Sequence, residues 1–223
     1  TRYSDYSNFG GTTNSKIGME WKPFADLLVR ATYADVFRAP TIGDLYSPTV
    51  PSANTYADPC NGYEGGNPTA CAGVPTDGSF QQSGNQVTSF QVSDPNLQPE
   101  HGDVLTYGFV YSPNWLEGFS VTADYWRVKL NDFIVNLPEN MLLNQCFNFG
   151  RFCDTFIRDA NGDVTQMTNL IGNYGSMKTS GMDLGFRYQL PEGAWGKLVW
   201  NLDTAYLAQY DVQLVAGDPT SNV

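Results

Sequence analysis

Two long runs of alternating side chains near the C-terminal end constrain the fold most strongly. In residues 181–190 and again in 197–210, apolar side chains take every second position, and polar or small residues take most of the others. A period of two is that of a β-strand, and the short connection 191–196 joins the runs into a hairpin. Each apolar face persists for roughly ten residues, as in a membrane-crossing barrel, whereas strands of soluble sandwiches are usually about five or six residues long. The pattern predicts that the alternate side chains from Leu198 to Tyr210 share one face.

Further segments alternate in the same way and bring the expected number of strands to about seven. They are residues 2–7, 14–22, 27–37, 101–112 and 119–130. The turns near residues 23, 113 and 191 are short, whereas residues 39–99 and 132–176 predict two long loops. Short turns on one side and long extracellular loops on the other are typical of outer-membrane barrels. The predicted fold is therefore all-β, an antiparallel up-and-down transmembrane β-barrel segment that forms one domain over residues 1–223.

Composition and charge exclude two classes of protein. The chain has 223 residues, and none of its apolar stretches approaches the roughly 20 residues of a membrane helix, which excludes a helical membrane protein. The formal net charge is -11, and no Lys or Arg lies between Arg38 and Arg127. A nucleic-acid partner requires the opposite sign and is excluded. We attribute the acidic surplus to solubility or repulsion at an exposed surface rather than to a cation site.

The four cysteines form two local pairs, each inside one of the long loops. Disulfides Cys60–Cys71 and Cys146–Cys153 are the simplest interpretation and imply an oxidising exterior. Zinc is the alternative, but the chain has one histidine, His101, and lacks the Cys-x-x-Cys spacing of structural zinc sites. We therefore predict two disulfides and no metal.

Motifs of catalysis and cofactor binding are missing from the sequence. No nucleophile motif such as Gly-x-Ser-x-Gly and no glycine-rich nucleotide loop is present, so we predict neither an enzyme nor a cofactor. His101 beside Glu100 is better explained as a polar strand end than as an acid–base pair. Residues 159–163 resemble a calcium loop but lack the downstream Glu, so we predict a plain hairpin tip there.

Three segments carry motifs with a recognisable order and spacing. They are residues 28–46, with Phe37, Arg38, Ala39 and Pro40; residues 94–100, with Pro95, Asn96, Leu97, Pro99 and Glu100; and residues 118–134. Together they resemble the C-terminal half of the β-barrel of TonB-dependent outer-membrane receptors. The resemblance implies a barrel of about 22 strands around an internal plug, of which this chain supplies about seven. Because Thr1 opens directly into strand-like sequence without a signal peptide, we expect the chain to be a fragment, with the plug and the closing strand outside it.

The resemblance implies a function for the parent protein in the outer membrane of a Gram-negative bacterium. It implies TonB-coupled uptake of a large scarce nutrient: a siderophore complex, a cobalamin or an oligosaccharide. The implied partners are outer-membrane lipid, an extracellular nutrient ligand and the TonB complex, which would bind the missing N-terminal part. The alternatives are a secreted β-sandwich that binds carbohydrate and an outer-membrane hydrolase. Loop aromatics could stack on sugar rings; they are Tyr46, Tyr56, Tyr63, Phe80 and Phe90.

Alternation also predicts which side chains face lipid, because an uncharged stripe is tolerated only where water is absent. The predicted set is Ile17, Met19, Trp21, Leu27, Val29, Ala31, Tyr33, Leu105, Tyr107, Phe109, Tyr111, Val121, Ala123, Met182, Leu184, Phe186, Tyr188, Leu198, Trp200 and Leu202. Aromatic residues near the short turns predict a periplasmic girdle. They are Trp21, Tyr111, Trp115, Tyr188, Trp195 and Trp200.

Arg38 and Glu100 bracket the first long loop and by parity both face the barrel lumen. Sequence-neighbouring strands usually pair, so the ends of the strands 27–37 and 101–112 should bring the two charges together. We predict a charge-assisted hydrogen bond at the lumen rim that fixes the base of the loop, in preference to direct ligand contact.

Overall fold

The structure is a computed structural model that describes residues 1–65, 69–194 and 196–222. It divides into two compact units. The strand unit comprises residues 1–39, 98–133 and 175–223, and the loop unit comprises residues 40–97 and 134–174. Among the described residues, no helix is long and apolar enough to span a membrane.

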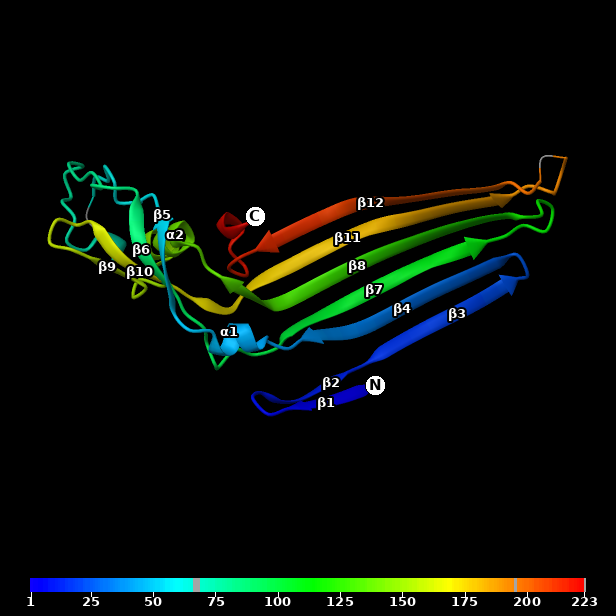
Figure 1. The fold of residues 1–223 in the computed structure, drawn as a ribbon, viewed down its shortest axis with the longest axis horizontal. Coiled ribbons are helices and arrows are strands. Elements are labelled where there is room, and N and C mark those ends of the chain that lie inside the picture. The colour runs from blue at the N-terminus through cyan, green and yellow to red at the C-terminus, as the bar shows by residue number, and fades with distance from the viewer. Residues whose placement is uncertain (66–68, 195, 223) are drawn as a thin grey trace. The chain divides into compact units, whose positions relative to one another are not determined.

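The strand unit is built on one antiparallel sheet of long strands (Figure 1). Its spatial order is β12-β11-β8-β7-β4-β3. The bounds are β3 Lys16–Phe24, β4 Leu27–Arg38, β7 Glu100–Tyr111, β8 Phe119–Asn136, β11 Ile171–Gln189 and β12 Val199–Gln213. The short turns β3–β4, β7–β8 and β11–β12 all lie at one end of this sheet (Figure 1). The predicted fold class is confirmed, as an open segment in which the described strands do not close a barrel.

The N-terminal residues form a separate hairpin. Strand β1, Arg2–Tyr6, pairs with β2, Gly10–Asn14, in a two-stranded sheet, and Ser15 separates β2 from β3. The backbone N–H of Asp35 donates to the carbonyl of Ser15 at 2.9 Å, so β4 still contacts the chain at this interruption. The segment expected as one strand over 14–22 therefore begins earlier, as β2, and continues as β3.

Over the part of the sheet nearer the short turns, the register separates apolar from charged side chains. On β4 and β7 the pairs Val29↔Phe109 and Ala31↔Tyr107 lie on one face, and Tyr107 also pairs with Tyr125 of β8. We call this the apolar face, and the predicted lipid-facing residues that take part in the strand pairing fall on it. The opposite, polar face carries Lys16, Glu20, Arg30, Asp124, Asp183, Arg187 and Asp203. A sheet with two such faces suits a wall between lipid and water.

Two details of the strands were not visible in the sequence pattern. Trp126, where the alternation is ambiguous, pairs with Thr106 and so lies on the polar face. In β12 the register shifts: Gln209 pairs with Ser180, and Leu207 pairs with Gly181. This bulge reverses the alternation and places Tyr210 opposite Thr179, so the expectation that one face continues to Tyr210 is wrong.

The predicted girdle residues occupy the turn end of the sheet. Tyr188 pairs with Trp200 close to the β11–β12 turn, and Tyr111 pairs with Leu27 beside the β3–β4 turn. Trp115 lies in the β7–β8 turn and is 77% exposed. Trp195 lies outside the described residues. The positions agree with the girdle, whose contact with the membrane stays a prediction.

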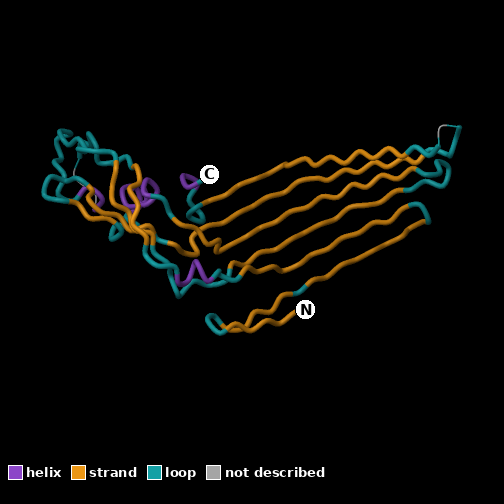
Figure 2. The backbone as a smooth tube through the Cα atoms, in the orientation of Figure 1, coloured by secondary structure: helices purple, strands orange, loops and turns teal. Residues whose placement is uncertain are grey.

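The loop unit is folded, in contrast to the irregular loops expected over 39–99 and 132–176. Figure 2 shows its short helices and strands. They are α1 Ile42–Tyr46, β5 Val50–Thr55, η1 Thr69–Cys71, β6 Gln86–Gln91, α2 Glu139–Phe149, β9 Phe156–Arg158 and β10 Val164–Asn169; a further short helix, η2 Pro219–Ser221, belongs to the strand unit. The four strands form a sheet in the order β5-β6-β10-β9, in which β6 and β10 are parallel. Strands β5 and β6 have six residues each, too short to show a clear period, which is why the sequence pattern missed them. Strands β9 and β10 are the two arms of the predicted hairpin.

A small core with two disulfides holds the loop unit together. Cys60 bonds to Cys71 and Cys146 bonds to Cys153, as predicted. Cys60, Cys146 and Phe80 are buried in one hydrophobic cluster with Ala70 and Val74. The hairpin at 159–163 is also confirmed: the N–H of Asp159 donates to the carbonyl of Asp163 at 2.9 Å, and this turn joins β9 to β10.

Candidate functional site

The rim pair, Arg38 and Glu100, lies at the loop-side ends of β4 and β7. The two residues are direct register partners, and Arg38 Nε donates to Glu100 Oε2 at 2.8 Å. A second hydrogen bond joins the terminal guanidinium nitrogen to Glu100 Oε1. The Glu100 side chain is 1% exposed and the Arg38 side chain is 46% exposed. The predicted pairing is confirmed, and because Glu100 is engaged by Arg38, the interpretation of His101 as a polar strand end is favoured.

The rest of the two motifs divides between the units. In the strand unit Phe37 packs edge-on against Tyr6, with ring centroids 5.9 Å apart, and Pro99 is buried. In the loop unit Pro40 is buried, and Leu97 packs with Leu45 and Ile134 in a second hydrophobic cluster. Pro95 and Asn96 are exposed. The motif residues thus serve mainly to build the transition from strand to loop.

A capping box organises the segment that follows the first motif. The Thr41 side chain accepts a hydrogen bond from the Asp44 N–H, and the Asp44 carboxylate accepts one from the Thr41 N–H. This reciprocal arrangement starts α1. The N–H of Asp94 donates to the Asp44 carbonyl at 3.1 Å, which ties the second motif to α1. The Thr-x-x-Asp spacing of residues 41–44 is the sequence signal for this cap.

The polar face of the strand unit contains an ion pair that spans three strands. Arg30 of β4 and Asp124 of β8 both pair with Gly108 of β7. The Arg30 guanidinium donates to both Asp124 oxygens, at 3.0 and 2.6 Å. A Cβ at Gly108 would lie 2.2 Å from the Ala123 carbonyl and 2.3 Å from the Asp124 carboxylate. The absence of a side chain at Gly108 is therefore what allows this pair to form.

A buried arginine joins the parts of the loop unit. Arg158 at the end of β9 donates to both Asp58 oxygens, at 2.5 and 2.8 Å, to the Ala70 carbonyl at 2.8 Å and to the Gly162 carbonyl at 2.6 Å. The Arg158 and Asp58 side chains are 6% and 0% exposed. Arg158 also lies 3.2 Å from the sulfur of Cys60. The sequence pattern did not single out this pair, because the two residues are remote in the chain.

A second buried carboxylate, Glu139, lies in the first turn of α2. It accepts hydrogen bonds from the side-chain amides of Asn54 of β5 and Asn169 of β10, the latter at 3.0 Å. Burial alone raises the pKa of Glu139, but hydrogen bonds from Asn54, Ser89, its own backbone N–H and Asn169 outweigh it and lower the pKa below its ordinary value. Glu139 thus acts as an ionised link between the helix and both strands.

The loop aromatics proposed for ligand stacking differ in accessibility. Tyr56 and Phe80 are 6% and 5% exposed, so the hypothesis that they stack on a ligand is wrong for this conformation. The Tyr56 hydroxyl donates to the Val164 carbonyl, and Phe80 belongs to the hydrophobic cluster that contains Cys60 and Cys146. Tyr63 packs edge-on against Phe147, with centroids 5.0 Å apart, and Phe90 is half-buried. Tyr46, at 61% exposure, remains accessible to a ligand.

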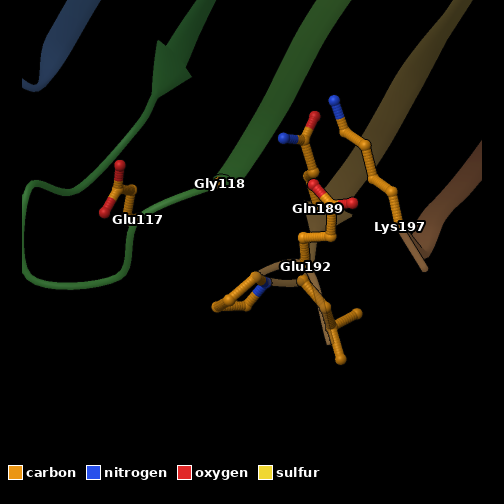
Figure 3. Close-up of a pocket in the computed structure, with 7 residues that line it drawn as sticks. Glu117, Gly118, Gln189, Glu192 and Lys197 are labelled. Atoms are coloured by element: carbon orange, nitrogen blue, oxygen red, sulfur yellow. The ribbon is translucent and has the colours of Figure 1, made fainter. Parts of the chain in front are cut away.

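Two cavities offer space for a small group. One of about 250 Å³ lies at the turn end of the strand unit, where Glu117, Gly118, Gln189, Glu192 and Lys197 line it (Figure 3). The N–H of Gln189 donates to the Gly118 carbonyl at 2.9 Å, which joins two of the short turns beside this cavity. The other, of about 390 Å³, lies in the loop unit beside α1 and is lined in part by Asp44, Val50 and Gln91. Its mixture of polar and apolar groups suits a small organic moiety.

Metal-ligating side chains do not gather in groups of three or more within the described part of the chain.

Comparison with known proteins identifies the family. The sequence model described as "TonB dependent receptor-like, beta-barrel" matches residues 1–223. No curated protein has a significantly similar sequence.

Solved structures share the fold. The siderophore receptor PirA from Pseudomonas aeruginosa has a TM-score of 0.55 and 15% identity over 94% of this chain and 31% of that receptor. The ferric enterobactin receptor PfeA from the same organism, solved with enterobactin, has a TM-score of 0.59 and 14% identity over 93% and 24% of the two chains. The RagAB peptide importer has a TM-score of 0.52 and 14% identity over 94% and 19%. At such identities the likeness shows the fold alone.

The chain spans less than a third of the length of these receptors. Three observations point to the same fold. They are the sheet with one apolar and one polar face, the short turns at one end of it, and the family match over residues 1–223. The chain therefore belongs to the TonB-dependent receptors of the Gram-negative outer membrane, as part of their β-barrel domain.

Proposed function

We propose that the parent protein is an outer-membrane receptor that takes up a large, scarce extracellular nutrient and is coupled to the TonB complex through a segment outside this chain. The observation that carries the proposal is the separation of apolar and charged side chains between the two faces of the six-stranded sheet. A wall of this kind encloses a polar lumen within lipid. We assign it no catalytic role, in keeping with a family of receptors and transporters.

The secreted-sandwich alternative is disfavoured by the same sheet. A sandwich covers the apolar face of each sheet with the other, yet Ile17, Trp200 and Leu202 are 71%, 71% and 62% exposed. In addition, β8 and β11 are 18 and 19 residues long, far beyond the usual strand of about five or six residues in sandwiches.

The charge of the loop unit bears on the ligand class. Its acidic residues are Asp44, Asp58, Glu64, Asp77, Asp94, Glu139, Asp154, Asp159 and Asp163, and its basic residues are Arg151 and Arg158. Because Arg158 forms a buried ion pair with Asp58, it adds no positive charge to the surface of the loop unit, which is strongly negative. Such a surface repels polyanions. We propose a neutral or cationic ligand, which is compatible with an uncharged siderophore complex, a cobalamin, an oligosaccharide or a basic peptide.

Uptake by whole cells tests the proposal. The full-length receptor would be expressed in a Gram-negative host that lacks its own receptors for the ligands offered. Each labelled ligand would then be supplied with and without an intact TonB complex. We expect accumulation of a neutral or cationic ligand that stops when TonB is deleted. Accumulation that persists without TonB would overturn the coupling, and selective uptake of a polyanionic siderophore would overturn the ligand class. A receptor that is soluble without detergent would support the sandwich instead.

A further inference from the structure

The polar face of the strand unit becomes apolar before it reaches the rim. On β4, β7, β8, β11 and β12, the residues of this face that lie between the Arg30–Asp124 ion pair and the rim pair are uncharged. The large aliphatic residues among them are Val36, Val104, Val128, Leu130, Met177 and Val212. We call these six residues the lumen band. The band crosses five neighbouring strands on the side of the wall that is polar elsewhere.

Close contacts between β8 and β11 show that the lumen band is continuous across these strands. A Cβ at Gly181 would lie 2.7 Å from the Trp126 ring, and the Trp126 indole N–H donates to Asp183 at 3.3 Å. Trp126 and Gly181 therefore lie side by side on the polar face. In an antiparallel ladder, four residues further toward the loop end, Leu130 comes to lie beside Met177.

The bulge in β12 adds an aromatic ring to this surface. Ala208 is the extra residue between two successive pairs of β12 with β11. Without it, Tyr210 would lie on the same face as Tyr206, which pairs with Met182 on the apolar face. The bulge instead places Tyr210 opposite Thr179, next to the lumen band, where it is 59% exposed. Bulges often redirect a side chain beside a functional site.

The lumen band needs an apolar partner, because the inner face of such a wall borders water. Val104, Val128 and Leu130 are only half-buried. A contiguous apolar surface that faces water marks a binding site. Aliphatic side chains offer no hydrogen bonds, so sugar hydroxyls placed on them would lose their water without replacement. The occupant of the lumen band is therefore apolar where it touches the wall.

An acidic hollow borders the lumen band on the side of the short turns. Its volume is about 290 Å³, and Asp124, Asp183 and Asp203 line it. Arg30 pairs with Asp124, so Asp183 and Asp203 give the hollow its surplus negative charge. Other basic groups of this face lie outside the hollow, with Arg187 two residues beyond Gly185 toward the turns and Lys16 on the edge strand β3. An ammonium or guanidinium group complements such a hollow.

We propose that the lumen band, together with Trp126 and Tyr210, binds the apolar part of an amphipathic organic cation whose charged group enters the hollow beside Asp183. A short peptide with adjacent apolar and basic side chains has this chemistry. The Trp126 ring lies between the band and Asp183, where an aromatic face attracts both an apolar group and a cation. The inference rests on the proposed function and narrows its neutral or cationic ligands to apolar cations.

Isothermal titration calorimetry of the full-length receptor in lipid nanodiscs tests this inference. Three capped tripeptides serve as probes: acetyl-Leu-Phe-Lys amide, acetyl-Ser-Gly-Lys amide and acetyl-Leu-Phe-Glu amide. Heats measured with empty nanodiscs are subtracted, which removes partition into lipid. The test variant is Tyr210→Ala. The matched control is Tyr206→Ala, which removes the same side chain, 67% exposed, from the opposite face of the same strand.

We expect wild type to bind acetyl-Leu-Phe-Lys amide about tenfold more tightly than either of the other peptides. Tyr210→Ala should weaken this binding about tenfold, and Tyr206→Ala should leave it unchanged. Asp183→Asn should remove the preference for the lysine peptide over the glutamate peptide. Asp211→Asn should keep that preference, because Asp211 pairs with Lys178 on the opposite face.

Three results would overturn the inference. They are no binding of the lysine peptide to wild type, equal affinities for the three peptides, and an equal loss in both tyrosine variants. A Tyr210→Ala receptor that unfolds at a lower temperature yet binds the peptide normally would show that the plug covers the lumen band, which also overturns the inference. The assay needs no TonB complex, so each of these results leaves TonB-coupled uptake of another ligand intact.

Discussion

Arg38 and Glu100 face each other across β4 and β7, and the partly exposed guanidinium holds a carboxylate that is almost completely buried. This asymmetry changes the energetics expected for a rim pair. A surface ion pair contributes about 1 kcal/mol or less. Loss of Arg38 would instead leave the Glu100 charge in a site with little access to water. This is more costly than loss of the Glu100 charge, which leaves a guanidinium that water can reach.

We therefore expect Arg38→Gln to destabilise the full-length receptor by roughly 2–4 kcal/mol and Glu100→Gln by about 1 kcal/mol. Urea unfolding in lipid vesicles, followed by tryptophan fluorescence, measures both. The charge-swapped double variant, Arg38→Glu with Glu100→Arg, should retain more uptake than either single charge reversal. If Arg38→Gln and Glu100→Gln reduced the free energy of unfolding by the same amount, burial of Glu100 would not govern the stability of the pair.

Much of the strand unit was predictable from the sequence because a strand that separates lipid from water repeats every two residues. That rule is local. Arg38 keeps the alternation of Arg30 on β4, and Glu100 keeps that of Gly108 on β7, so the alternation alone predicted that Arg38 and Glu100 share a face. The rule failed at the β-bulge near Leu207, where one extra residue reverses the alternation without any change in composition.

The loop unit was not predictable by the same argument. Its parallel pairing of β6 with β10 joins segments that are remote in the chain, and neither strand carries a long pattern. Once the two loops fold together, Tyr56 and Phe80 become core residues rather than surface aromatics. The Asp58–Arg158 pair is equally non-local. The disulfides were predictable because each joins cysteines that are close in sequence.

Gly108 offers a test of the polar face. Gly108→Ala should destabilise the receptor by about 1–3 kcal/mol, because the new Cβ would collide with the Ala123 carbonyl and with the Asp124 carboxylate that Arg30 binds. Gly18→Ala is the matched control: Gly18 lies on the same face of β3, and a Cβ there would have only ordinary contacts, at 3.6 Å or more. Urea midpoints in vesicles measure the difference. A Gly108→Ala variant as stable as the control would contradict the close packing around the ion pair.

The pH dependence of the loop unit should follow Glu139. Its pKa in the folded unit is lowered from the ordinary value of 4.5, so its contribution to stability is complete above that value and is lost as the pH falls through the folded pKa. Wild type should therefore lose more loop-unit stability than Glu139→Gln when the pH falls below 4.5. Limited proteolysis of the loop unit across this range measures the effect, with exposed Glu64→Gln as control. Parallel pH profiles for wild type and Glu139→Gln would rule out this role.

The two disulfides should differ in their contributions. Cys60–Cys71 closes a separation of 11 residues and Cys146–Cys153 closes one of 7. Chain entropy predicts roughly 2–3 kcal/mol for each. Replacing Cys60 and Cys71 with serine should be the more damaging change, because Arg158 also contacts the Cys60 sulfur. Mass mapping without reduction checks the pairing, and protease resistance of the loop unit compares the variants. A link between Cys60 and Cys146 would overturn the local connectivity.

The orientation of the wall is tested by placing one charge on each face. Leu184 lies on the apolar face and pairs with Thr204, whereas Ala205, one position along β12, pairs with Asp183 on the polar face. Arginine at a lipid-facing position near the membrane midplane costs about 2–4 kcal/mol, while arginine in a polar lumen costs little and can pair with acidic neighbours. We expect Leu184→Arg to reduce the free energy of unfolding in vesicles by that amount. Ala205→Arg should leave the free energy of unfolding within about 1 kcal/mol of wild type. The opposite ranking would mean that the apolar face lines the lumen, and equal effects would mean that neither face contacts lipid.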